Sequence, residues 1–212
     1  FEGEQGSICM ASYSMRTYAT NMLKNNSSNT ALVTLLSDLM MYGEQAQIYL
    51  NYKTDNLVTE GMSLTPSTFT SVPDTCNKQA MGGTADGFSK IKAAGVVMLS
   101  KMTVRFKIEV ADPTAYTYKV EIAGREYEYT AEDLERVGTT NEYYLYFDEI
   151  QATEFDEVIT MSFWQNGAQV SRYVEYSVNT YIYSKQSSAT GNLLAMIKAI
   201  YNYGVSANAY FG

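Results

Sequence analysis

The 212-residue chain contains no histidine. This absence excludes Ser-His and Cys-His nucleophile pairs, zinc sites with histidine ligands and the commonest general base of enzymes. Chemistry run by paired carboxylates, such as glycoside hydrolysis, remains open. The adjacent acidic pairs Asp148-Glu149 and Asp156-Glu157 are more typical of solvated strand ends and turns. We therefore expect a protein that is not an enzyme, with no catalytic residues, no metal site and no cofactor.

Basic clusters and long apolar runs are also missing. The formal net charge is −8, without a long run of either sign, which argues against binding to nucleic acid or to anionic lipid. No apolar stretch approaches the roughly 18 to 20 residues that cross a bilayer, so we expect no membrane insertion. The first residues lack the basic segment followed by an apolar one that marks a signal peptide. Location must therefore be inferred from other features.

Cysteine and tryptophan are rare. The two cysteines, Cys9 and Cys76, match no metal-binding or redox spacing. In an exported protein they could form a disulfide that closes a long loop and adds a few kcal/mol of stability, and the alternative is two unpaired buried thiols. Trp164 is the single tryptophan, against 19 tyrosines. Tyrosine is favoured in strands and on exported surfaces, because its ring packs while its hydroxyl stays in water.

Near its start the sequence predicts a helical hairpin. The spacing of Met15, Tyr18 and Met22 marks one face of a first helix, which the polar stretch NNSSN ends. A second helix follows, with Ser28 or Asn29 as its N-cap. Its apolar stripe consists of Leu32, Leu35, Leu36, Leu39, Tyr42, Ala46 and Tyr49.

The same hairpin recurs at the other end of the chain. Tyr176-Ser177 aligns with Tyr13-Ser14, and the helix ending Tyr-Gly-x-x-Ala-x-x-Tyr at 42–49 recurs at 203–210 after a two-residue difference in the turn. Glycine inside a helix costs roughly 1 kcal/mol relative to alanine. The repeated glycine therefore predicts a backbone that lies close to another element, and we interpret the repeated tyrosines as packing residues rather than ligand contacts.

Between the hairpins the hydrophobic period changes from helical to alternating. The segment KMTVRFKIEV alternates strictly, and YTYKVEIAG, REYEYT, EYYLYFDEI and DEVITMSFWQ continue the pattern. Asn166-Gly167 is a strong two-residue hairpin signal, because both positions tolerate positive φ. Several short strands at roughly ten-residue spacing, with no helix between them, predict an antiparallel β-sandwich.

We therefore predict a mainly β chain with α: an antiparallel β-sandwich flanked by helical hairpins at both chain ends. The predicted parts are an N-terminal hairpin (1–52), a connector (53–88), the sandwich (89–175) and a C-terminal hairpin (176–212). The connector holds all three prolines and is expected to contain a strand near Thr68 to Val72. All four parts could also form one compact domain.

The junction VSRYVEYSVNTYIYS, followed by LLAMIKAIYNYGVSANAYF, resembles the repeat modules of large surface proteins and multimodular polysaccharide-degrading proteins of gut-dwelling Gram-positive anaerobes. In those modules a hairpin with this Tyr-Gly ending closes the unit and NYxTDNL often follows, as NYKTDNL does at 51–57. The first ending departs from the pattern, with Leu50 where the second has Phe211. The resemblance implies a secreted or surface-attached, non-catalytic module whose partners are polysaccharide or cell-wall glycan and neighbouring modules. The alternative is a structural spacer or a filament or adhesin repeat without a ligand.

Three aromatic residues are candidates for sugar contacts. If Tyr143 and its alternate neighbours point into the core, Tyr144 and Tyr146 project outward as a platform with a spacing of roughly 6.5 to 7 Å. Trp164 lies beside the Asn-Gly turn, where its ring could stack on a sugar. The alternatives are that the tyrosines only pair across strands or are covered by the helices, and that the tryptophan covers a sheet edge.

Overall fold

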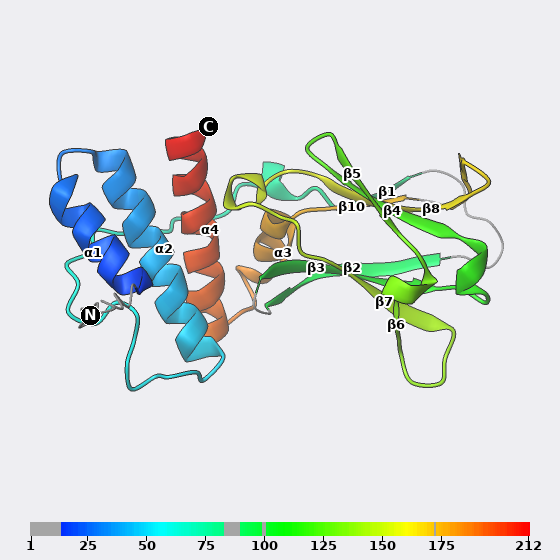
Figure 1. Ribbon diagram of the computed structural model, residues 1–212, viewed down its shortest axis with the longest axis horizontal. Coiled ribbons are helices and arrows are strands. Elements are labelled where there is room, and N and C mark those ends of the chain that lie inside the picture. Colours follow the sequence, from blue (N-terminus) through cyan, green and yellow to red (C-terminus); the bar gives the residue numbers. More distant parts are fainter. Residues whose placement is uncertain (1–13, 83–89, 99–100, 172) are drawn as a thin grey trace, which may run out of the picture.

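The computed structural model describes residues 14–82, 90–98, 101–171 and 173–212. Helices from both chain ends gather at one side of the molecule, and two antiparallel sheets occupy the other side (Figure 1). Helices at both chain ends are as predicted. The two hairpins, however, do not lie on either side of the sheets but pack together.

The helices begin at equivalent residues in the two hairpins. They are α1 (Met15–Asn25), α2 (Thr30–Tyr49), α3 (Val178–Lys185) and α4 (Gly191–Phe211). Ser14 caps α1 by accepting a hydrogen bond from the Thr17 backbone N–H, and Ser177 caps α3 through Thr180 in the same way. Asn29 caps α2, which confirms one of its two predicted N-caps.

Helices α2 and α4 form the contact between the hairpins. They run in opposite directions and lie side by side (Figure 1). The rings of Tyr42 and Tyr203, which occupy the same position in the repeat, stack with centroids 5.7 Å apart and an interplanar angle of 9°. Of the predicted stripe of α2, Leu32, Leu35 and Leu36 are buried, whereas Tyr49 is 40% exposed.

The face of α1 that Met15, Tyr18 and Met22 mark is not its buried face, although Met22 is half-buried. Met15 is 56% exposed and Tyr18 39%, while Ala19 is the buried residue of this helix. In α3, the residue equivalent to Met15 is Val178, which is fully buried. The difference has a physical reason: α3 is packed against the sheets and α4, whereas α1 packs mainly on α2.

Sheet A has the strand order β1-β10-β8-β4-β5, with β9 paired to β8. Sheet B has the order β2-β3-β7-β6, and all pairs in both sheets are antiparallel. The strands of sheet A are β1 (Ala80–Gly82), β4 (Thr117–Ile122), β5 (Arg125–Tyr129), β8 (Ile159–Gln165), β9 (Ala168–Gln169) and β10 (Tyr173–Tyr176). Those of sheet B are β2 (Lys90–Met98), β3 (Met102–Glu109), β6 (Glu135–Arg136) and β7 (Glu142–Phe147).

Local turn chemistry explains two of the hairpins. Asn166 and Gly167 both have positive φ, at 51° and 76°, and they join β8 to β9 as the sequence predicts. Ala123 and Gly124 play the same part between β4 and β5, with φ of 48° and 74°. Two-residue turns of this kind match the twist of the paired strands.

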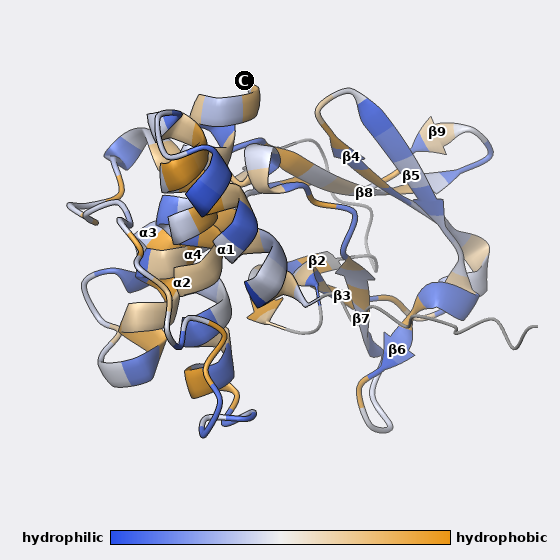
Figure 2. Cartoon of the chain, turned by 60° about the vertical axis from the view of Figure 1, so that its left-hand side comes forward, coloured by the Kyte–Doolittle hydropathy of each residue, from blue (hydrophilic) through white to orange (hydrophobic). Residues whose placement is uncertain are grey.

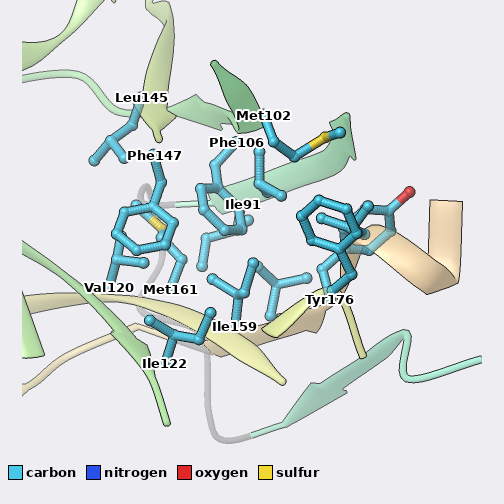
Figure 3. Close-up of a cluster of buried hydrophobic side chains, with 14 of the residues drawn as sticks. Ile91, Met102, Phe106, Val120, Ile122, Leu145, Phe147, Ile159, Met161 and Tyr176 are labelled. Carbon is cyan, nitrogen blue, oxygen red and sulfur yellow. The ribbon is translucent and has the colours of Figure 1, made fainter. Parts of the chain in front are cut away.

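The inward-facing side chains of both sheets form one hydrophobic cluster (Figure 3). Phe106, Leu145 and Phe147 come from sheet B, and they face Val120 and Met161 of sheet A (Figure 3). The cluster continues into the helices through Val178, Ile182, Met196, Ile197 and Ile200. The sheets and the C-terminal hairpin therefore share a single core.

The predicted connector is tied to the helices by hydrogen bonds. The Gln186 side chain accepts from the backbone N–H of Val72 and donates to its carbonyl oxygen. Residues 68–72 do not form the predicted strand, and at Val72 a glutamine of the helical hairpin binds both backbone groups that a neighbouring strand would need. Strand β1 instead begins at Ala80 and pairs with β10, so the sheets begin earlier than the predicted boundary at residue 89.

Within the ranges described above, none of the helices combines the length and the apolar character needed to cross a membrane.

Candidate functional site

Tyr144 and Tyr146 lie on the outer face of sheet B. Tyr143, Leu145 and Phe147 are buried, whereas the two tyrosines between them are half-buried. This alternation is the one that the sequence predicts. The helices lie at one end of the sheets rather than across this face (Figure 1), so the tyrosine pair remains accessible to a ligand.

The two tyrosine rings do not form a flat platform. Their centroids are 6.1 Å apart and their planes are inclined by 61°. Arg105, from the neighbouring strand β3, places its guanidinium carbon 4.3 Å from the centroid of the Tyr144 ring. A planar guanidinium is well suited to stack on an aromatic face, so the arginine and the tyrosine hold one another in place.

The register of sheet B arranges this face in rows across the strands. Gly95, Arg105 and Tyr146 form one row, and Ala93, Lys107 and Tyr144 form the next. A Cβ atom added to Gly95 would meet nothing within 4 Å. Edge strand β2 therefore forms a low step beside the longer side chains of β3 and β7.

Polar groups lie beside the Tyr146 hydroxyl and elsewhere on this face. Partial burial and hydrogen bonding to Glu135 raise the pKa of Tyr146, and hydrogen bonding to Arg105 acts in the opposite direction. Lys107 is paired with Glu142, whose carboxylate lies 2.8 Å from the ammonium nitrogen. Aromatic faces and hydrogen-bonding groups thus stand side by side, which is what binding of a polyhydroxylated ring requires.

Trp164 lies on the outer face of the other sheet. The strands of sheets A and B form separate layers, so their outer faces look away from each other (Figure 2). The indole Nε1 donates to the Ser162 hydroxyl at 2.9 Å, and the Lys119 ammonium lies 4.5 Å from the centre of the indole ring system. The structure therefore does not bring the tryptophan and the tyrosine pair together, and it provides Trp164 with partners of its own.

Cys76 is buried, at 6% exposure, and forms no disulfide with any residue that the structure describes. Burial, followed by the interaction with Asp156, raises the pKa of the thiol to about 11. A thiol with so high a pKa is a poor nucleophile at neutral pH. Cys9 lies outside the described residues, so a disulfide between the two cysteines stays a prediction.

The acidic pairs make structural contacts. Asp148 and Glu149 both lie 3.3 Å from the ammonium nitrogen of Lys101, and Asp156 lies close to Cys76 and to the Asn179 amide. Over the described residues, no group of three or more Cys, Asp and Glu side chains is placed to hold a metal ion.

A hollow of about 590 Å³ lies between the turn at Gln151–Thr153 and the last turns of α4. Tyr203, Ala207 and Phe211 line it from the helix. Its lining contains no acid–base pair, so it provides no catalytic arrangement. The hollow marks a gap in packing at the helix end.

Arg105 is the site residue that sequence reasoning missed. Strand alternation places it outward, together with Lys107 and Glu109. Its contact with Tyr144 depends on the register between β3 and β7, which are distant in the sequence. Only that register singles it out from the other outward-facing charges.

Compared with protein-family models, curated proteins and solved structures, the chain gives no match.

Proposed function

We propose that the chain is a non-catalytic polysaccharide-binding module in which the two sheets form a β-sandwich. The outer face of sheet B, with Tyr144, Tyr146 and Arg105, is the binding surface. The observation that carries the proposal is the outward-facing, half-buried aromatic pair of β7, with the Arg105 guanidinium over one of its rings. Rings of this kind cover the apolar C–H face of a sugar, and the charged groups bond to its hydroxyls.

We also propose that the module acts outside the cell, on a secreted or surface-attached protein. The support is the resemblance of its repeated hairpin to modules of such proteins, together with a surface rich in tyrosine. In this setting the helical hairpins form the structural support of the module, and sheet B binds the glycan. A module that only binds needs no catalytic groups, in keeping with a sequence that lacks histidine.

Affinity electrophoresis tests the proposal. The wild-type protein should be retarded in gels that contain a soluble polysaccharide chosen from a broad panel. Tyr144→Ala should reduce the retardation about tenfold or more, if a sugar on this ring gains as much as a nucleic-acid base gains by stacking on an aromatic side chain, roughly 1 to 3 kcal/mol. Trp164→Ala is the matched control, since it removes an aromatic residue from the outer face of the other sheet.

No retardation by any glycan in the panel would overturn the proposal. Equal losses in the two variants would also count against it, because the effect would then not come from the surface around Tyr144. Circular dichroism of both variants shows that a loss of binding does not reflect a loss of folding.

A further inference from the structure

Arg105 differs from the other cations on the outer face of sheet B. Lys92 lies 2.7 Å from Glu109, and Lys107 lies 2.8 Å from Glu142. Among the described residues, no carboxylate oxygen lies within 4 Å of the Arg105 guanidinium. A guanidinium has five N–H donors. The Tyr146 hydroxyl, which also bonds to Glu135, interacts with Arg105, and this single contact leaves donors for a ligand.

The guanidinium is also held in position. Its carbon lies over the Tyr144 ring, 4.3 Å from the ring centroid, and Tyr146 is the residue paired with Arg105 on the neighbouring strand β7. A group ordered in this way loses less freedom when it binds, so more of its interaction energy appears as affinity. Arg105 is therefore suited to planar, two-point recognition of an acidic group, which a lysine would not provide.

The surface beside Arg105 leaves room for such a group. On the side away from the tyrosines its neighbour is Gly95, where even a Cβ atom would have no contact within 4 Å. The next residue on this step is Ala93, which is exposed. Neighbouring strands are roughly 4.8 Å apart, so an acidic group above Gly95 lies within reach of the guanidinium, while the adjoining part of the ligand covers the tyrosines.

We propose that this face binds an acidic polysaccharide, in which Arg105 grips the carboxylate of a uronic acid unit and an adjoining sugar stacks on the tyrosine pair. The inference rests on the proposed function and names its ligand class. The net charge of −8 opposes a polyanion at long range. Recognition therefore depends on this one contact rather than on a basic patch.

The test compares two glycans with the same sugar backbone, each cast in affinity gels: polygalacturonate, and its fully methyl-esterified form, in which every carboxylate is a neutral ester. The wild-type protein should be retarded at least about tenfold more strongly by the acid form, as expected for a hydrogen-bonded charge pair. Arg105→Gln should remove this difference, and Arg105→Lys should restore only part of it. Lys119→Gln, which makes the same charge change on sheet A, should leave it intact.

The outcomes separate the inference from the proposed function. Equal retardation by the acid and ester forms, or an unchanged preference in Arg105→Gln, overturns the inference while polysaccharide binding stands. Retardation by neutral glycans alone has the same meaning. No retardation by any gel overturns both. Thermal unfolding of Arg105→Gln and Arg105→Lys confirms that each variant is folded when it is tested.

Discussion

At the scale of single residues, the repeated glycine lets another segment approach the helix closely in both hairpins, but the neighbouring residue differs. A Cβ atom added to Gly204 would lie 2.8 Å from Cδ2 and 3.2 Å from Cβ of Phe155. At Gly43 the nearest atom would be Cγ1 of Val58, at 3.1 Å. The prediction that glycine permits a close approach is confirmed in both places, and the approach at Gly204 is the tighter one.

This difference predicts unequal effects of the same substitution. Gly204→Ala should lower the free energy of unfolding by about 1 to 2 kcal/mol, because the overpacking against a buried ring exceeds the roughly 1 kcal/mol gained in helix propensity. Gly43→Ala should change it by less than about 0.5 kcal/mol, since the end of a valine side chain can move. Urea denaturation measures both changes, and a larger loss in Gly43→Ala would contradict the packing described here.

At the scale of elements, hydrogen bonds hold the connector to both α2 and α4 at Ser67. The Asp38 carboxylate, at 1% exposure, accepts hydrogen bonds from the backbone N–H and the hydroxyl of Ser67, both at 2.7 Å. From the other helix, the Asn202 side-chain amide donates to the Ser67 carbonyl oxygen at 2.7 Å. One connector residue thus joins the two hairpins.

Removal of this junction should be costly and non-additive. We expect Asp38→Ala to lower the free energy of unfolding by about 2 to 3 kcal/mol, because hydrogen bonds to a charged group are strong. Asn202→Ala should cost about 1 kcal/mol. The double variant should lose less than the sum, since both side chains act through Ser67. Chemical denaturation tests this cycle, with the exposed Asn208→Ala as control, and strict additivity would argue against a shared junction.

Features set by neighbouring residues could be predicted from the sequence. The N-cap at Asn29, the turn at Asn166-Gly167 and the inward side chains of β7 all follow from local patterns, and the structure has them. The exposed positions of Met15 and Tyr18 could not be predicted, because the helical period does not say which partner is present. The place of Arg105 beside Tyr144 depends on strand register, which distant segments decide together.

For the same reason, the two hairpins could be predicted from the sequence but their packing against each other could not. Each hairpin has its caps and apolar stripe in its own sequence. The contact between the hairpins joins α2 and α4, which are separated in the sequence by all the strands of both sheets. No local sequence pattern predicts a contact between segments so far apart. The connector has no clear local signal either, since Ser67 binds side chains of α2 and α4, and Val72 binds that of Gln186, the residue after α3.

At the scale of the whole molecule, buried phenols and a thiol make the fold sensitive to alkali. Burial is the main cause that raises the pKa of Tyr129 and of Tyr176 to about 12, and that of Cys76 to about 11. Burial also raises the pKa of Tyr118, which is fully buried. In the unfolded chain these groups ionise near their usual values of roughly 9 to 10, so alkali favours the unfolded state.

The free energy of unfolding should therefore be unaffected by these groups below about pH 8, where all of them are protonated in both states, and should fall as the pH rises towards 12. Each group contributes a slope of up to about 1.4 kcal/mol per pH unit, and the thiol contributes only if Cys76 is unpaired. Thermal unfolding between pH 7 and 11 measures the trend. Tyr176→Phe should flatten it, and Tyr52→Phe, at an exposed position, should not. A stability that stays constant up to pH 11 would refute this account.

The stacked pair Tyr42 and Tyr203 limits how the molecule can assemble with others. Equivalent residues of the two repeats meet across antiparallel helices, so the hairpins are related by an approximate two-fold axis. A contact of this kind is self-complementary and complete with two members, unlike a head-to-tail contact, which continues without limit. If further modules of this type followed one another in a chain, this surface would join their hairpins only two at a time. A filament would need a second, different contact surface.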